Sequence, residues 1–171
     1  MRVARLAPMA HFLRWFFGVD HVDRGSLLAL RIAFYGGLAI CIVEAVGSPL
    51  DLPLSVVGLA LILVGGVLRY LAGAWLGDLW SERLRIAPDH RLVRRGLYRR
   101  IRNPSYLGLS LVFLGAVITF QSGCGLVVFL LGFAPALAYR IRLEEDLLER
   151  NFGDDYRDYA RRTKRLIPYV L

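Results

Sequence analysis

The sequence predicts an all-α integral membrane protein with four transmembrane helices, an N-terminal interfacial helix and a cytoplasmic C-terminal helical region. Three observations favour this fold class. Hydrophobic residues make up 56% of the 171 residues, several long runs are apolar, and the run from Asn103 to Tyr139 carries no charge. As one helix that run would extend about 55 Å, whereas the hydrocarbon core of a bilayer is about 30 Å thick. We therefore expect it to fold back into a hairpin.

The first 26 residues alternate apolar side chains with arginine and histidine, a pattern typical of a helix lying at the membrane interface. The first predicted span follows from Leu27 to Val46 and is interrupted by Arg31 and Glu44. Because a cation inside a span is costly in lipid, we expect Arg31, like Arg69 in the next span, to face the helix bundle, a cavity or an interface.

The second predicted span covers Leu54 to Gly77. Both spans contain glycines, and small residues allow helices to approach closely in lipid. We therefore interpret these glycines as packing surface and not as ligand contacts. They are Gly36, Gly37, Gly58, Gly65, Gly66 and Gly73.

The charge-free segment supplies the other two spans. Gln121 to Gly125 form the expected turn, and Pro104 begins the third helix at a position where its missing N–H is harmless. The fourth helix should continue past the membrane to about Arg150 and end at Phe152-Gly153. A final amphipathic helix from Asp154 to about Lys164 has acids at its start and bases at its end, matching the helix dipole.

Arginine sets the predicted orientation. Residues 78–102 carry eight arginines against three acids, whereas the outer turns 47–53 and 121–125 carry no basic residue. Positive-inside counting therefore places both termini and the central loop in the cytoplasm. A basic cytoplasmic face against anionic lipid explains the net charge of +8, so we expect the lipid bilayer and no nucleic acid as partner.

The chain is expected to form a single membrane domain, residues 1–171. Within it, residues 1–26 form the interfacial N-terminus, 27–77 the first two helices, and 78–171 a cofactor-binding loop, the hairpin and the C-terminal helices. The two cysteines are too few and too far apart to suggest a disulfide framework or a metal site.

Two polar clusters flank the hairpin on its predicted cytoplasmic side. Arg140 and Glu144 are four residues apart and share one helix face. Two interpretations stay open: an exposed helical salt bridge, or a site in which Arg140 clamps an anionic group and Glu144 binds a cationic ligand or hydroxyls. Glu145 points elsewhere and is available to orient the loop arginines.

The other cluster contains Tyr98 and Tyr106, which are either interfacial anchors or parts of a site. Gly96 suggests a tight turn or a close backbone approach to a ligand. His90 lies among arginines with no second histidine or cysteine at metal-ligand spacing, so no metal is predicted.

These motifs in combination resemble the isoprenylcysteine carboxyl methyltransferase family, within a wider group that includes phospholipid methyltransferases. The resemblance covers roughly residues 78–168, and the first two helices match only as generic spans. The motifs are Asp89-His90-Arg91-Leu92-Val93, Gly96-Leu97-Tyr98, Arg102-Asn103-Pro104-Ser105-Tyr106, Arg140 to Glu145, Phe152-Gly153-Asp154-Asp155-Tyr156 and Leu166-Ile167-Pro168.

The resemblance implies a helical membrane enzyme that binds S-adenosylmethionine in a cytoplasmic pocket, with a lipophilic or lipidated acceptor reaching it from the bilayer. Arg140 would be the catalytic residue that holds the acceptor carboxylate. The candidate cofactor contacts are His90, Leu92, Val93, Gly96, Tyr98, Asn103, Pro104, Ser105, Tyr106, Glu144 and Glu145.

One position departs from the family pattern. The family usually has Arg-His-Pro where this chain has Arg102-Asn103-Pro104. Asparagine can donate and accept hydrogen bonds but cannot become cationic, so a geometric role survives here and a proton-transfer role does not. A carboxylate acceptor is already ionised at neutral pH, so methyl transfer to it needs alignment and desolvation but no general base.

O-methylation of a lipophilic carboxylate is therefore the leading hypothesis. Methylation of a phospholipid or other amine, methylation of a thiol, and a non-catalytic membrane scaffold are the alternatives. Of the 22 basic residues 21 are arginine, which suggests a GC-rich bacterial genome and an inner-membrane location. The acceptor would then be a small lipid or a secondary metabolite, and the oligomeric state stays open.

Overall fold

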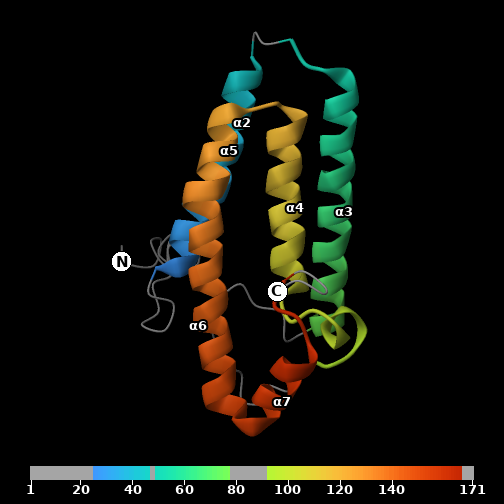
Figure 1. The fold of residues 1–171 in the computed structure, drawn as a ribbon, viewed down its shortest axis with the longest axis vertical. Helices are drawn as coiled ribbons and strands as arrows, with labels where there is room; N and C mark the ends of the chain where they lie inside the picture. Colours follow the sequence, from blue (N-terminus) through green and yellow to red (C-terminus); the bar gives the residue numbers. More distant parts are fainter. Residues whose placement is uncertain (1–24, 47–48, 78–91, 167–171) are drawn as a thin grey trace, which may run out of the picture.

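The computed structural model describes residues 25–46, 49–77 and 92–166, and these ranges form an elongated bundle of helices (Figure 1). The elements in chain order are α2 (Ser26–Ala45), α3 (Leu52–Leu76), the 3-10 turn η2 (Gly96–Arg99), α4 (Pro104–Thr119), α5 (Gly123–Val128), the π-helical segment Phe129–Phe133, α6 (Ala134–Phe152) and α7 (Asp154–Arg162). The prediction of an all-helical membrane protein is confirmed for this part of the chain.

Three of the described helices are long and apolar enough to cross a membrane: Ser26–Ala45, Leu52–Leu76 and the continuous helix Gly123–Phe152. Helix α4 is apolar but has only 16 residues, about 24 Å at 1.5 Å per residue. By length, three of the four predicted spans reach across a bilayer of about 30 Å, and the third predicted span, which is α4, is shorter.

Helix α3 begins two residues before the predicted start because Asp51 caps it. The Asp51 carboxylate accepts a hydrogen bond from the Leu54 backbone N–H at 2.8 Å, and Pro53 occupies the first turn, where no N–H is needed. Gln121, in the next turn along the chain, donates to the Asp51 carbonyl at 3.1 Å. The α2–α3 and α4–α5 turns therefore lie at the same end of the bundle (Figure 1).

The predicted hairpin is confirmed, with its turn between Phe120 and Ser122. Gln121 adopts a positive φ of 51°, which directs the chain back. The Ser122 hydroxyl caps α5 by accepting from the Gly125 N–H at 2.8 Å. Glu44, one of the two charges that interrupt the first apolar run, accepts from the Ser122 hydroxyl and from the Cys124 N–H.

Helices α5 and α6 form one continuous helix through the π-helical segment Phe129–Phe133. Pro135 lies just after that segment, and proline cannot donate the backbone hydrogen bond that would close the preceding α-helical turn. The wider turn follows from that missing donor. Helix α6 then extends well beyond the level at which α4 begins (Figure 1), as the continuous leucine pattern predicted.

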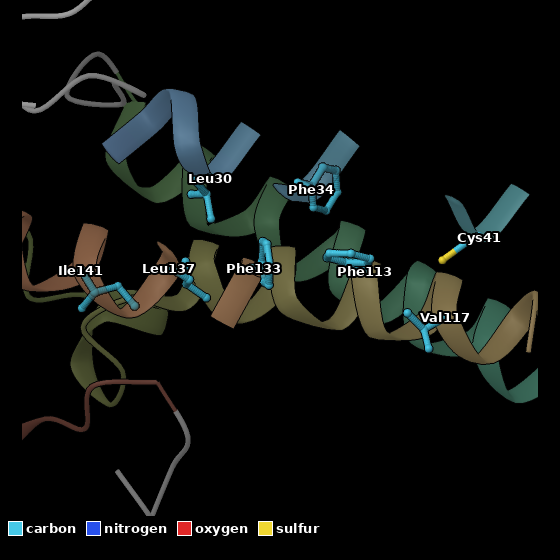
Figure 2. Close-up of a cluster of buried hydrophobic side chains, with 8 residues drawn as sticks. All are labelled: Leu30, Phe34, Cys41, Phe113, Val117, Phe133, Leu137 and Ile141. Atoms are coloured by element: carbon cyan, nitrogen blue, oxygen red, sulfur yellow. The ribbon is translucent and has the colours of Figure 1, made fainter. Parts of the chain in front are cut away.

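The core lies where α2, α4 and the α5–α6 helix meet (Figure 2). Four phenylalanines dominate it, with ring centroids 5.1 to 5.6 Å apart for Phe113 against Phe34, Phe129 and Phe133. These edge-to-face contacts stabilise the packing beyond the burial of area alone. Gly37 on α2 makes room for the Phe113 ring, because a Cβ there would lie 2.1 Å from it.

Helices α3 and α4 pack through glycines. A Cβ on Gly65 would lie 2.6 Å from the Gly108 carbonyl oxygen, and one on Gly58 would lie 2.6 Å from the Gly115 carbonyl. Both contacts are with backbone, so the helices could not accommodate a larger residue without separating. The packing interpretation is confirmed for these glycines and for Gly37, whereas Gly66 and Gly36 face open space.

The chain after α6 returns to the start of α4. Gly153, with φ 53°, ends α6, and α7 runs to Arg162 instead of Lys164. The following segment pairs with the residues before α4: the Arg102 N–H donates to the Lys164 carbonyl at 2.8 Å, and the Lys164 N–H donates to the Arg100 carbonyl at 2.9 Å. The C-terminal segment is thereby fixed beside η2.

Several predictions concern residues outside the described ranges. These are the interfacial helix predicted for residues 1–26, of which 1–24 lie outside the described ranges, most of the arginine-rich loop (78–91), His90 within it, and the terminal Ile167-Pro168.

The α3–α4 interface yields a test with a neighbouring control. Gly65→Ala should lower the free energy of unfolding by about 1–3 kcal/mol, because the added methyl group meets the α4 backbone. Gly66→Ala, with no atom within 4 Å, should leave it unchanged or raise it slightly. Reversible unfolding in mixed micelles, followed by circular dichroism, measures both. Equal stability of the two variants would contradict backbone contact at Gly65.

Candidate functional site

A cavity of about 350 Å³ opens at the end of the bundle where η2 and α7 lie. This volume is within the range of small-molecule sites, roughly 300–1,000 Å³. Side chains from α2, α3, α4, α6, α7 and the segment before α4 line it. The hairpin reversal and the return of the C-terminal segment together assemble this wall from distant parts of the chain.

The cavity has an apolar wall and a polar end. Leu30 and Phe34 of α2 and Leu109 and Val112 of α4 form the apolar wall, continuous with the bundle core. The polar end contains a carboxylate on α6 and hydroxyls from η2, α4 and α7. Such a cavity can hold a ligand that has both a charged and an apolar part.

A chain of hydrogen bonds, partly buried at Tyr106 and Glu144, links α4, α6 and α2 at the cavity wall. The Tyr106 hydroxyl donates to Glu144 Oε2 at 2.7 Å and accepts from Arg140 Nε at 3.3 Å. Arg140 Nη1 donates in turn to the Ser26 hydroxyl at 2.9 Å. Arg140 is 1% exposed and does not line the cavity, whereas Tyr106 and Glu144 do. Arg140 and Glu144 therefore do not form the exposed salt bridge that was one of the two interpretations. They are linked through the Tyr106 hydroxyl instead.

Glu145, the neighbour of Glu144, faces away from the cavity. Its carboxylate accepts from Arg102 Nε at 3.0 Å, from Asn103 Nδ2 at 3.2 Å and from Arg165 Nη2 at 2.7 Å. The prediction that Glu145 orients the arginines before α4 is confirmed for Arg102. Glu145 is buried, and three donors compensate its desolvation.

Asn103 acts here as a hydrogen-bond donor to two acceptors. Its amide Nδ2 reaches Glu145 Oε1 and the Arg165 carbonyl, the latter at 3.1 Å. Neither contact requires a proton that titrates. Asn103 therefore has a positioning role, one that the sequence left open: it ties the start of α4 to α6 and to the C-terminal segment.

Three tyrosines outside the membrane-spanning helices, Tyr98, Tyr156 and Tyr159, line the polar end of the cavity. The Tyr159 hydroxyl donates to the Tyr98 carbonyl at 2.8 Å and so holds η2 against α7. Burial raises the pKa of Tyr159 to about 12, against the opposing charge of Arg102. Burial, and then the charge of Glu144, also raises the pKa of Tyr98. These hydroxyls therefore keep their protons at neutral pH and remain donors.

Tyr156 is different from its neighbours. It lines the cavity, is 4% exposed, and its hydroxyl has no hydrogen-bond partner among the described residues. A buried hydroxyl without a partner costs about 1–3 kcal/mol. An unpaired donor on a cavity wall is what a site for a polar ligand would provide.

The structure brings most of the predicted site residues to one place. Seven line the cavity: Leu92, Val93, Tyr98, Asn103, Ser105, Tyr106 and Glu144. Four do not: Arg140, Glu145, Pro104, which is buried, and Gly96. Gly96 has a positive φ of 61° and lies against the Trp75 ring, so its close backbone approach is to a side chain of α3.

Sequence reasoning missed several lining residues. Arg31 and Arg69 were expected to face the bundle, a cavity or an interface, and both line this cavity, but neither was assigned to the site. Arg69 Nη1 donates to the Ser105 hydroxyl at 2.9 Å. Tyr156 belonged to a motif that carried the family resemblance, and that signal could have identified it. Tyr159, on the same helix, was not singled out.

Comparisons with known proteins agree on one family. The family model described as "Isoprenylcysteine carboxyl methyltransferase (ICMT) family" matches residues 57–150, more than half of the chain. A probable protein-S-isoprenylcysteine O-methyltransferase of Oryza sativa subsp. indica is 30% identical over 118 residues, which cover 68% of this chain and 62% of the relative. The protein-S-isoprenylcysteine O-methyltransferase of Saccharomyces cerevisiae is also 30% identical over 118 residues, 68% of this chain and 49% of the relative.

A solved structure of the eukaryotic intramembrane Ras methyltransferase ICMT is similar in fold. It has a TM-score of 0.64 and 24% sequence identity, covering 99% of this chain and 55% of that one. The chain thus spans less than two thirds of the length of these relatives.

The Glu145 cluster yields the second prediction. Glu145→Ala should lower the free energy of unfolding by about 1–3 kcal/mol, because it leaves the half-buried Arg102 without its anion. Asn103→Asp should also destabilise, because it replaces two donated hydrogen bonds with a second negative charge. Glu149→Ala is the control, since its ion pair with Arg157 is exposed. Equal unfolding midpoints for Glu145→Ala and Glu149→Ala would show that the cluster does not hold the C-terminal segment.

Proposed function

The chain belongs to the isoprenylcysteine carboxyl methyltransferase family, and from this premise we propose that it is a membrane methyltransferase that uses S-adenosylmethionine to methylate the carboxylate of a lipophilic acceptor. One observation carries the proposal: a single cavity joins a polar end containing Glu144 to an apolar wall made by membrane-spanning helices. A soluble cofactor and a lipophilic acceptor could meet in such a cavity.

The polar end has the chemistry that S-adenosylmethionine requires. Glu144, held by the Tyr106 hydroxyl, supplies an anion for the ammonium group of the cofactor. The rings of Tyr98, Tyr106 and Tyr156 line the same region, and aromatic faces attract cations such as a sulfonium. The unpaired Tyr156 hydroxyl supplies a further donor.

The full set of residues proposed to form the cofactor site combines the family assignment with the lining of the cavity. It comprises His90, Leu92, Val93, Gly96, Tyr98, Asn103, Pro104, Ser105, Tyr106, Glu144 and Glu145, with Tyr156 added. Among these, Glu145 and Asn103 act by holding the segment before α4 in place, and Pro104 by starting α4 at the cavity.

When bound, S-adenosylmethionine supplies a methyl group on a sulfonium centre. The protein's part is to align an ionised carboxylate with that methyl group and to exclude water from it. No residue has to remove a proton, which agrees with an asparagine at position 103 and with tyrosines whose pKa values lie above the neutral range. An amine acceptor would lose a proton during the reaction, and this site gives less support for that chemistry.

Arg140 is assigned by the resemblance to the acceptor carboxylate, and this assignment stays a prediction. Arg140 is 1% exposed, and Tyr106, to which it donates, lies on the cavity wall. We therefore propose that Arg140 is a positioning residue, which fixes the Tyr106 hydroxyl and through it the Glu144 carboxylate.

The setting of the reaction follows from the helices and the charges. The three long apolar helices and the family membership indicate an integral membrane protein. We further propose a bacterial inner membrane, with both termini in the cytoplasm and the cavity open to the side where S-adenosylmethionine is made. The names of the relatives describe O-methyltransferases that act on protein S-isoprenylcysteine. For this chain we propose a carboxylate carried on a lipid, a secondary metabolite or a lipidated chain.

The third prediction concerns cofactor binding. Calorimetric titration of the purified protein with S-adenosylhomocysteine should give saturable binding. Glu144→Gln should weaken it about tenfold or more, because a charged hydrogen bond contributes about 1.5–3 kcal/mol. Tyr156→Phe should weaken it several-fold, whereas Tyr139→Phe, on an exposed position of α6, should have no effect. Absence of binding in the wild type would favour the non-catalytic scaffold.

The same protein, incubated with methyl-labelled cofactor and membrane extract, identifies the reaction type. A methyl ester releases its label in mild base, whereas an N-methyl or S-methyl product does not. Label that resists base would replace O-methylation with one of the two alternatives.

The fourth prediction separates the two roles of Arg140. If Arg140 positions Tyr106 and Glu144, Arg140→Ala should reduce cofactor affinity and methyl transfer together, and Arg140→Lys should restore part of both. Tyr106→Phe should reproduce the affinity loss with the ring still in place. Loss of transfer with unchanged cofactor affinity would return Arg140 to the acceptor carboxylate.

A further inference from the structure

A smaller hollow, with a volume of about 290 Å³, lies between the end of α7, the segment that follows it and Arg102. It shares only Arg102 with the larger cavity. Five of its seven lining residues are basic and none is acidic, so we refer to it as the basic hollow. The five are Arg102, Arg161, Arg162, Lys164 and Arg165.

Backbone pairing brings these cations together. The Arg102 N–H donates to the Lys164 carbonyl, and the Lys164 N–H donates to the Arg100 carbonyl. The segment after α7 therefore runs beside the residues that precede α4 (Figure 1), and both segments are rich in arginine. Because like charges repel, an anion that neutralised part of this charge would stabilise the paired segments.

Helix capping does not account for the exposed cations. Basic side chains near the end of a helix can bind its last carbonyls and interact with its dipole. In α7 this position is taken by Arg102, whose Nη1 donates to the Ala160 carbonyl at 2.7 Å and to the Thr163 carbonyl at 2.5 Å. Arg162 and Lys164 are exposed, and neither side chain is paired with an acid among the described residues.

Two carboxylates balance part of the charge of the basic hollow. Glu145 accepts from Arg102 at 3.0 Å and from Arg165 at 2.7 Å. Asp158 lies 3.5 Å from Arg161, in an exposed pair. Five cations thus meet two acids, and the excess of positive charge includes the side chains of Arg162 and Lys164.

The basic hollow lies at the level where the apolar part of the bundle ends. Arg102 is two residues before the apolar helix α4, and Leu166, next to Arg165, packs against the apolar core. Trp75, in the last turn of α3, is 42% exposed and lies against Gly96 of η2. Because tryptophans at the ends of membrane-spanning helices typically stand at the level of the lipid headgroups, the cations lie at the depth of lipid phosphates.

From this arrangement we propose that the basic hollow binds the phosphate of an anionic phospholipid, in the leaflet at that end of the bundle. The phosphate oxygens accept from Arg162 and Lys164, and the acyl chains stay in the membrane. A guanidinium presents parallel N–H donors that match a phosphate. A zwitterionic phospholipid carries its own ammonium group, which these cations repel, so the site selects anionic headgroups. The proposal goes beyond methyl transfer and does not depend on it.

A lipid bound here also acts on the larger cavity. It neutralises charge between the two paired segments, and η2, in the first of them, supplies Tyr98 to the cavity wall. Bound lipid therefore stabilises the pairing that holds this wall in place.

The fifth prediction is measured by native mass spectrometry of the full chain, titrated in detergent micelles with dioctanoyl lipids. The wild type should bind phosphatidylglycerol at least tenfold more tightly than phosphatidylcholine. Arg162→Gln/Lys164→Gln should weaken binding of phosphatidylglycerol about tenfold or more, because it removes two cations beside the headgroup, and should leave phosphatidylcholine unchanged. Arg142→Gln/Arg150→Gln removes the same charge from exposed positions on α6 and is the matched control.

A charge-conserving variant separates loss of the site from loss of the fold. Arg162→Lys/Lys164→Arg keeps both cations and should retain most of the preference for phosphatidylglycerol. If this variant loses the preference as completely as Arg162→Gln/Lys164→Gln, the two side chains support the fold and the proposed phosphate contact is wrong.

Three further outcomes would overturn the proposal. Equal binding of the two lipids by the wild type would mean that the basic hollow does not select an anion. Equal losses in the α6 control would mean that lipid responds to the charge of the whole surface. Displacement of the lipid by an equal concentration of inorganic phosphate would identify a soluble phosphate as the ligand. A wild type that selects phosphatidylglycerol but binds no S-adenosylhomocysteine would refute the methyltransferase and leave the lipid site standing.

Discussion

The hydrogen bond from the Tyr106 hydroxyl to the Glu144 carboxylate joins residues 38 positions apart in the sequence. The candidate site depends on the reversal of the chain that brings these two residues together. A charge-free run too long for one crossing must reverse direction after its first crossing. The reversal at Phe120–Ser122 brings the first turn of α4 beside α6. Without it, the Glu144 carboxylate and the Tyr106 hydroxyl would lie far apart and could not share a cavity.

The reversal is itself secured by polar contacts at the opposite end of the bundle. Ser122 caps α5 by accepting from the Gly125 N–H, and Glu44 accepts from the Ser122 hydroxyl and from the Cys124 N–H. The start of a helix leaves backbone N–H groups without partners inside the helix, so an acid at the end of α2 is stabilising there. Glycine contacts between α3 and α4 then fix the remaining helix against the hairpin.

The geometry of α6 points two adjacent acids, Glu144 and Glu145, toward different partners. Glu144 faces the cavity and Tyr106, whereas Glu145 faces Arg102, Asn103 and Arg165. Successive residues on a helix point about 100° apart, so the two carboxylates need no further device to diverge. In the proposed function Glu144 supplies charge to the cofactor, whereas Glu145 holds Arg165 of the C-terminal segment beside the start of α4. The Glu144-Glu145 pair therefore places a proposed ligand contact next to a residue that holds the C-terminal segment in position.

Hydropathy and turn chemistry determined much of this protein from the sequence alone. The spans in residues 27–46 and 54–77, the hairpin turn, the extension of the fourth helix and the final helix all appear within a few residues of their predicted bounds. These features depend on local composition and on the thickness of a bilayer. Tertiary structure decided which side chains share the cavity: it set Arg140 behind Tyr106 and brought Arg31, Arg69 and Tyr156 onto the wall. Sequence spacing gives the face of a helix on which a residue lies, but only the packing of that helix against others decides what the face meets.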